Sequence, residues 1–347
     1  MTLSLHSVPV ELSCPSRFSI IERKLEELHE SGAIMDAADP FKRESNRLMK
    51  GSKKEEFTEL LENSPVTSCA VLISDELVFE WTKWDMSLDV PVKVNSVTKS
   101  VLSTIIGIAS EKEILNLYDP VSSFFPDVSM QDHFGSITVD HLLTMSSGLE
   151  WPGNRHLYES ENWLSFILER TVKENPGQEM AYIEANSHLL SVILTETAGK
   201  PCSFFAAEEL FKVIGIPSRQ WDTDPQGYNT GGFGLSLSPM DMLKFGRLYL
   251  QNGRWGSQQV VREDWIELAV KPHLHTVRGQ QRYGRHWWVN PESERLPFFY
   301  YAAGSGGQYI FVVPEKKMVC VFTGDYGRNG GTQPFTWFTR YLLRAFD

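Results

Sequence analysis

A serine and a lysine three residues apart, Ser96 and Lys99, are the residues whose types and spacing best fit covalent chemistry. They open the apolar segment SVTKSVLSTIIGIA, whose pattern predicts a helix. At about 100° per residue, the two side chains share one stripe of that helix with Ser100, Ser103 and Gly107. We therefore expect the lysine to be buried and its amine to lie beside the Ser96 hydroxyl.

Burial would suit this pair to nucleophilic catalysis. It disfavours the ammonium form and lowers the pKa of a lysine, which makes Lys99 a candidate general base. Ser96 would lie where unpaired backbone N–H groups and the helix dipole favour negative charge. This environment suits an alkoxide and the oxyanion of a tetrahedral intermediate. For the helix taken alone, a capping serine with a lysine that reaches toward water is the alternative interpretation.

The composition excludes several other functions. The chain has 347 residues, of which 41% are hydrophobic and 22% charged, as in ordinary globular proteins. Lys and Arg number 33 against 44 Asp and Glu, and the resulting net charge of -11 argues against nucleic acid as a partner. The sequence has neither a signal-peptide pattern nor an apolar run of membrane-spanning length. We expect a cytoplasmic protein with no membrane partner.

No residue pattern predicts a metal or another cofactor. His273 and His275 lack further ligands at the spacing of a zinc site, so we expect a pair of loop histidines. The four cysteines are scattered and predict small buried hydrophobic residues. They are Cys14, Cys69, Cys202 and Cys320.

The elements around Ser96 and Lys99 predict a sheet assembled from distant segments. Helical spacing marks residues 18–28, 42–62 and much of 96–250, and a closing helix is expected over 332–346. Strand patterns are a hairpin at 69–81 and the segments 282–290, 308–314 and 317–324. We predict an α/β protein of the α+β type, with an antiparallel sheet flanked by helices and an inserted, mainly helical lobe. Residues 1–95 and 251–347 would form the α/β lobe with an N-terminal helical appendage, and residues 96–250 the helical lobe.

Five segments resemble, in order, the class C β-lactamase-like serine hydrolases. This family includes penicillin-binding proteins, DD-peptidases, family VIII esterases and 6-aminohexanoate-dimer hydrolases. The segments are SVTKS with its trailing helix at 96–127, then 137–151, 174–200, 231–255 and 302–324. The resemblance implies a β-lactamase/DD-peptidase-like fold and a single catalytic domain over residues 1–347.

The resemblance also implies roles for individual residues. Ser96 would be the acylated nucleophile and Lys99 its general base. Tyr182, at the position of the second-motif tyrosine, would relay a proton to the leaving group. The backbone N–H groups of Ser96 and Ser305 would form the oxyanion hole. A tyrosine packed under the cleft is the alternative for Tyr182.

Two positions depart from the family pattern. Glu184 stands where the second motif usually has Asn or Ser, and a carboxylate near Lys99 would raise the pKa of the lysine. Glu184 would then bind a substrate amine or point away, with Asn186 in the polar role, and we favour a position at the surface or behind the site. Ala302 replaces the third-motif cation, which favours neutral esters, amides or lactams as substrates. Gly304 would let the substrate approach the backbone.

Aromatic residues are candidates for contact with the substrate. Trp151, Tyr158 and Trp163 lie in the stretch that forms a lid in the family, and Trp287 and Trp288 lie on a predicted strand beside the cleft. Core packing is the simpler interpretation of each. The candidates for substrate contact are Trp151, Tyr158 and Trp288.

Three functions are compatible with these residues. The first is a metal-independent serine hydrolase that cleaves a small-molecule ester or amide through an acyl-enzyme on Ser96. The second is an acyltransferase or cyclase of a biosynthetic pathway, which would use the same acyl-enzyme. The third is a non-catalytic binding protein on a catalytic fold, suggested by Glu184 and Ala302. The sequence predicts no oligomeric state.

Overall fold

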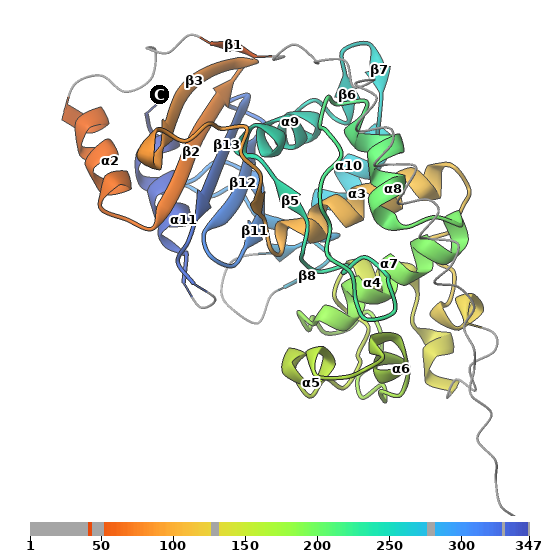
Figure 1. The fold of residues 1–347 in the computed structure, drawn as a ribbon. Coiled ribbons are helices and arrows are strands. Elements are labelled where there is room, and N and C mark those ends of the chain that lie inside the picture. The colour runs from red at the N-terminus through yellow and green to blue at the C-terminus, as the bar shows by residue number, and fades with distance from the viewer. Residues whose placement is uncertain (1–40, 44–51, 126–131, 276–281, 328–329, 346–347) are drawn as a thin grey trace, which may run out of the picture. The chain divides into compact units, whose positions relative to one another are not determined.

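A nine-stranded sheet forms the centre of the structure, a computed structural model that describes residues 41–43, 52–125, 132–275, 282–327 and 330–345. Its strand order is β1-β3-β2-β13-β12-β11-β10-β9-β8 (Figure 1). The strands are β1 Lys42–Arg43, β2 Val66–Ile73, β3 Glu76–Thr82, β8 Leu274–His275, β9 Arg282–Tyr283, β10 Trp288–Asn290, β11 Phe299–Gly304, β12 Gln308–Val313 and β13 Met318–Gly324. All neighbouring strands are antiparallel apart from β1 and β3. The predicted antiparallel sheet is confirmed.

The central strands are apolar on both faces because both faces of the sheet are covered. Along β2, Ala70 and Leu72 belong to one buried cluster, while Cys69 and Val71 belong to another. Such burial explains why these strands have nearly continuous apolar runs rather than alternating polar and apolar residues.

Helices form a layer on each side of the sheet (Figure 1). One cluster joins the sheet to α2 (Ser52–Glu62) and to α11 (Gln333–Trp337), which continues as the π-helical η5 (Phe338–Leu342). The other joins it to α3 (Val97–Glu111), α9 (Pro239–Leu250) and α10 (Glu263–Val270). A Cβ atom at Gly246 of α9 would lie 2.5 Å from Val319 on β13, so this helix and the sheet are in close contact.

Between α3 and β5 the chain forms one long helix and several short ones. The long one is α7 (Glu184–Ala198), which packs against both α3 and α4. The others are η2 Val121–Phe124, η3 Asp132–Ser136, α4 Val139–Leu143, α5 Asn154–Tyr158, α6 Trp163–Leu168, α8 Cys202–Ala206 and η4 Ala207–Phe211. Two small sheets pair β4 (Val92–Lys93) with β5 (Ser236–Leu237) and β6 (Arg254–Trp255) with β7 (Gln258–Gln259). Among the described residues, no helix is long and apolar enough to cross a membrane.

Several predicted elements can be compared with the structure directly. The hairpin at 69–81 is confirmed, and Ser74 and Asp75 at its turn have positive φ values of 49° and 69°. Positive φ at both positions is typical of the two-residue turns that match strand twist. The helix predicted over 42–62 is wrong at Lys42–Arg43, which pair with β3, and correct over α2. The helix predicted at 18–28 lies outside the described residues.

The strand predicted over 282–290 is two short strands. The chain leaves the ladder between Tyr283 and Trp288, and His286 there has a φ of 60°. His275 lies in the edge strand β8 and not in the expected loop. The cysteines follow the prediction where they are described, because Cys69, Cys202 and Cys320 are free and buried. Cys14 lies outside the described residues.

Candidate active site

The start of α3 brings Ser96 and Lys99 together. Ser96 is the N-cap residue of α3, but its side chain makes no capping hydrogen bond. Lys99 Nζ lies 3.3 Å from Ser96 Oγ, and Lys99 is 1% exposed. The expected burial and contact are therefore present, and the interpretation as a capping serine with a lysine reaching toward water is wrong.

The polar stripe of α3 is held by the segment between β9 and β10. Ser100 Oγ donates to the His286 carbonyl at 2.7 Å, and Ser103 Oγ donates to the Arg285 carbonyl at 2.7 Å. That segment is anchored in turn by a buried ion pair between Arg285 Nε and Asp140 Oδ1 at 2.6 Å. These bonds fix the rotation of α3 and hence the direction in which Ser96 and Lys99 point.

The buried Lys99 amine contacts a carboxylate. Its Nζ lies 2.9 Å from Glu184 Oε1 and 3.1 Å from Oε2, and it donates to the Gly232 carbonyl at 2.8 Å. Glu184 is the first residue of α7 and is itself 8% exposed. The surface position that we allowed for Glu184 is wrong, because its carboxylate is buried and serves as the counter-ion that a buried ammonium needs. A position behind the site, in contact with the lysine, fits the structure.

Neighbouring groups reverse the change in pKa that burial alone would give Lys99. Burial lowers the pKa of Lys99, but the Glu184 carboxylate and, after it, the phenol group of Tyr182 raise it, and the net result is a raised pKa. The lowering expected from burial alone is therefore outweighed, in the direction expected for a carboxylate near Lys99. Burial and the nearby Lys99 charge lower the pKa of His286 to about 3, so this imidazole stays neutral.

Tyr182 lies over the lysine on the exposed side of the site. It is two residues before α7, and its ring centroid is 5.0 Å from Lys99 Nζ. The ring stacks on Trp288 at 5.7 Å and meets the edge of Tyr283 at 5.9 Å. At 39% exposure, Tyr182 is not packed under the cleft. Trp288 is a candidate from the sequence, whereas the buried Tyr283 is not, because its aromatic type alone does not distinguish it from other core residues.

The end of β11 lies against the start of α3. A Cβ atom at Gly304 would be 2.2 Å from the Val94 carbonyl oxygen and 3.1 Å from Ser96 N. Asn95 Nδ2 donates to the Ser305 carbonyl at 2.7 Å and so links the two segments. The two expected oxyanion-hole residues, Ser96 and Ser305, therefore belong to backbone segments in direct contact. Ala302, on the same strand, is buried and brings no charge.

Two predicted substrate residues have contacts elsewhere. Asn186 is fully buried, its Nδ2 lies 3.5 Å from Met145 Sδ, and its Oδ1 has no partner among the described residues. Trp151 donates from Nε1 to Asn154 Oδ1 at 2.8 Å and packs on Phe166. These contacts do not connect Asn186 or Trp151 to Ser96 and Lys99.

Tyr158 is linked to the site through a neighbour of Gly232. Its ring packs on Phe233 at 5.5 Å and on Trp163 at 5.3 Å. Phe233 directly follows the residue whose carbonyl accepts from Lys99. Phe233 and Gly232 were not singled out from the sequence. The available signal was the run GGFG at 231–234, since glycines mark places where the backbone must approach other groups closely.

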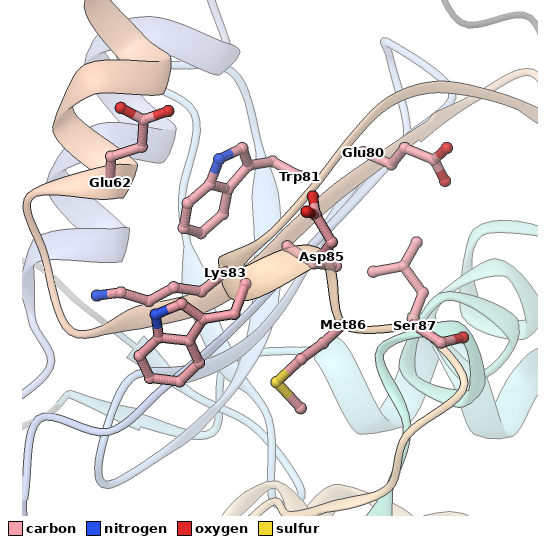
Figure 2. Close-up of a pocket in the computed structure, with 10 residues that line it drawn as sticks. Glu62, Glu80, Trp81, Lys83, Asp85, Met86 and Ser87 are labelled. Atoms are coloured by element: carbon pink, nitrogen blue, oxygen red, sulfur yellow. The ribbon is translucent and has the colours of Figure 1, made fainter.

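A separate surface cavity of about 630 Å³ lies beside the end of β3 and the 3₁₀ turn η1 (Lys83–Asp85). Figure 2 shows Glu62 of α2, Trp81, Lys83 and Asp85 around it. None of the predicted site residues lines this cavity. Within the described ranges, no three His, Cys, Asp or Glu side chains gather in a way that could hold a metal ion.

Comparisons with solved structures show the fold. A Bacillus anthracis protein described as a 6-aminohexanoate-dimer hydrolase superposes with a TM-score of 0.74 at 20% identity, over 86% of this chain and 85% of its own. An octameric penicillin-binding protein homologue from Pyrococcus abyssi superposes with a TM-score of 0.68 at 19% identity, over 83% of this chain and 76% of its own. The predicted β-lactamase-like fold is confirmed.

Sequence comparisons agree with this fold. The D-alanyl-D-alanine-carboxypeptidase/endopeptidase AmpH of Escherichia coli is 22% identical over 271 residues, which cover 67% of this chain and 70% of AmpH. Residues 55–329 match the family described as Beta-lactamase, and this stretch contains Ser96, Lys99, Tyr182 and Glu184. The chain belongs to the β-lactamase family.

Proposed function

We propose that this protein is a serine hydrolase that cleaves an ester or amide through an acyl-enzyme on Ser96. The observation that carries the proposal is the contact of 3.3 Å between Lys99 Nζ and Ser96 Oγ at the N-terminus of α3. A buried amine beside a serine hydroxyl that is not used for capping is an arrangement suited to nucleophilic catalysis. AmpH and the Bacillus anthracis protein are both named as hydrolases, which supports the same class.

The reaction would proceed in two steps on Ser96. Ser96 Oγ attacks the acyl carbon, and its proton passes through Tyr182 to the leaving group, so that an acyl-enzyme and the free alcohol or amine result. The backbone N–H groups of Ser96 and Ser305 would stabilise the oxyanion, each contributing about 3 kcal/mol. Water then cleaves the acyl-enzyme and restores the serine.

The surroundings of Ser96 favour an uncharged acyl group. Lys99 is already paired with Glu184, and Ala302 offers no cation to a substrate carboxylate. The stacked rings of Tyr182 and Trp288 add an aromatic surface next to the lysine. We therefore propose neutral esters or amides with an apolar acyl group as substrates.

Labelling with a fluorophosphonate, followed by peptide mass spectrometry, tests this function. The expected adduct is on Ser96, and Ser96→Ala should abolish both the adduct and the turnover of p-nitrophenyl esters. Ser110→Ala is the matched control, because it makes the same change at the far end of α3. Hydrolysis that persists in Ser96→Ala, or labelling confined to another residue, would refute the proposal.

A further inference from the structure

The polar partners of Lys99 match the hydrogen-bonding capacity of an ammonium ion. An ammonium has three N–H donors and no acceptor. The acceptors around Nζ are the Glu184 carboxylate, the Gly232 carbonyl and Ser96 Oγ, at 2.9 Å, 2.8 Å and 3.3 Å. The longest of these contacts is the one to the serine, so the amine is held chiefly by the other two groups.

The space around the ion pair leaves little freedom for either partner. A Cβ atom at Gly232 would lie 1.7 Å from Glu184 Oε2 and 2.8 Å from Lys99 Nζ. The backbone of Gly232 therefore lies directly against both charged groups. With Lys99 at 1% exposure and Glu184 at 8%, water is largely kept from the pair.

The charge of Lys99 depends on Glu184. Burial by itself favours the neutral amine, and the neighbouring His286 is held neutral and supplies no counter-charge. The Glu184 carboxylate opposes burial, followed by the Tyr182 hydroxyl. Removing the carboxylate charge would thus take away the largest influence that opposes burial.

We propose that Glu184 is a positioning residue that fixes Lys99 as an ammonium ion, so that Lys99 acts on Ser96 as a fixed cation and not as a free-amine base. This inference rests on the proposed function of Ser96. In the acylation step, Oγ forms its bond to the acyl carbon while Tyr182 accepts the Oγ proton and passes its own hydroxyl proton to the leaving group. The carbon–leaving-group bond then breaks, and Lys99 keeps its proton throughout.

The pH dependence of kcat/KM for a neutral p-nitrophenyl ester separates the two roles of Lys99. If the ammonium is the working form, the wild-type rate falls at alkaline pH as Lys99 loses its proton. In Glu184→Gln this alkaline limb should move about 1–3 pH units lower, the range expected for a close opposite charge. Glu184→Asp keeps the charge and should retain an alkaline limb near that of the wild type.

Glu196→Gln is the matched control for the loss of a carboxylate. Glu196 is on the same helix and accepts a hydrogen bond from Tyr228, away from Lys99. Its pH profile should equal that of the wild type. An unchanged alkaline limb in Glu184→Gln, or a higher rate at neutral pH as expected for a freed amine base, would overturn the proposal.

A titration that does not use turnover distinguishes failure of this inference from failure of the proposed function. In ¹³C-lysine-labelled Ser96→Ala protein, the Cε signal of Lys99 should show an ammonium at neutral pH and titrate at lower pH once Glu184→Gln is added. A neutral Lys99 in the presence of Glu184 would overturn the inference even if Ser96 is acylated. A charged Lys99 in this titration, combined with no adduct on Ser96 when the wild-type protein is labelled with fluorophosphonate, would instead refute the hydrolase proposal.

Discussion

At the scale of single residues, the site contains one pair that local spacing predicts and one that it does not. Ser96 and Lys99 are neighbours on one helix, so their contact follows from a separation of three residues. Glu184 reaches the same lysine from 85 positions along the chain. Its type and position were visible in the sequence, but the packing of α7 on α3 decides where its carboxylate points.

His286 supplies a prediction about acid stability. Its pKa of about 3 in the folded protein lies below the usual value of about 6.5 for an unfolded chain. Between these values the unfolded chain binds more protons, so the free energy of unfolding falls as the pH drops from about 6.5 toward 3. The contribution that is lost is at most about 5 kcal/mol.

His286→Asn should make the acid dependence of stability shallower. Asparagine tolerates the positive φ of this position better than most residues do. The measurement is urea unfolding at pH 7 and at pH 4.5, with the exposed His156→Asn as control. The same loss of stability on acidification in the wild type and in His286→Asn would show that this histidine is not the cause.

At the scale of elements, the strands that end at their own turn residues were predicted correctly, and the strand that is interrupted by contact with a helix was not. The hairpin of β2 and β3, and strands β12 and β13, have apolar runs that end at turn residues, and they formed as expected. The segment 282–290 has the same residue types but breaks at His286, whose carbonyl accepts from Ser100 of α3. The one local signal for this break was Gly284, since a glycine inside a strand pattern indicates a bulge or a close backbone approach.

Gly107 tests how closely α3 must pack. A Cβ atom at this position would lie 2.3 Å from the Trp265 ring of α10. Gly107→Ala should therefore lower the free energy of unfolding by roughly 1–3 kcal/mol, although alanine is favoured in helices by about 1 kcal/mol. Thermal and urea unfolding measure the change, and Ser110→Ala on the same helix is the control. An unchanged or raised Tm would contradict the close contact.

At the scale of the whole molecule, the sheet joins segments from opposite ends of the chain. The strand β13 (Met318–Gly324) pairs with β2 (Val66–Ile73), although about 245 residues separate them in the chain. The helix α3, which follows Ser96, lies between these two strands in the sequence. Composition and periodicity indicated such a sheet, since strand patterns lay at both ends with helices between. Strand order and register depend on contacts between distant residues, which one sequence does not specify.

The protein carries a net charge of -11, and its active site offers a substrate carboxylate little attraction. Lys99 is already ion-paired with Glu184, and Ala302 has no charge. A carboxylate on the substrate would be repelled by the acidic protein and would find Lys99 already paired with Glu184. The kcat/KM of p-nitrophenyl butyrate should therefore exceed that of mono-p-nitrophenyl succinate by about tenfold or more. Added salt should narrow the difference because it screens charge. Equal or faster turnover of the carboxylate ester would contradict the proposed substrate class.

The most direct test of the central claim is the mass of Ser96 during turnover. Rapid acid quenching of the wild-type protein with a p-nitrophenyl ester, followed by peptide mapping, should find the acyl mass on the peptide that contains Ser96. The burst of p-nitrophenol should match the amount of enzyme. Turnover with no acyl mass on Ser96, and an equal rate in Ser96→Ala, would contradict the account.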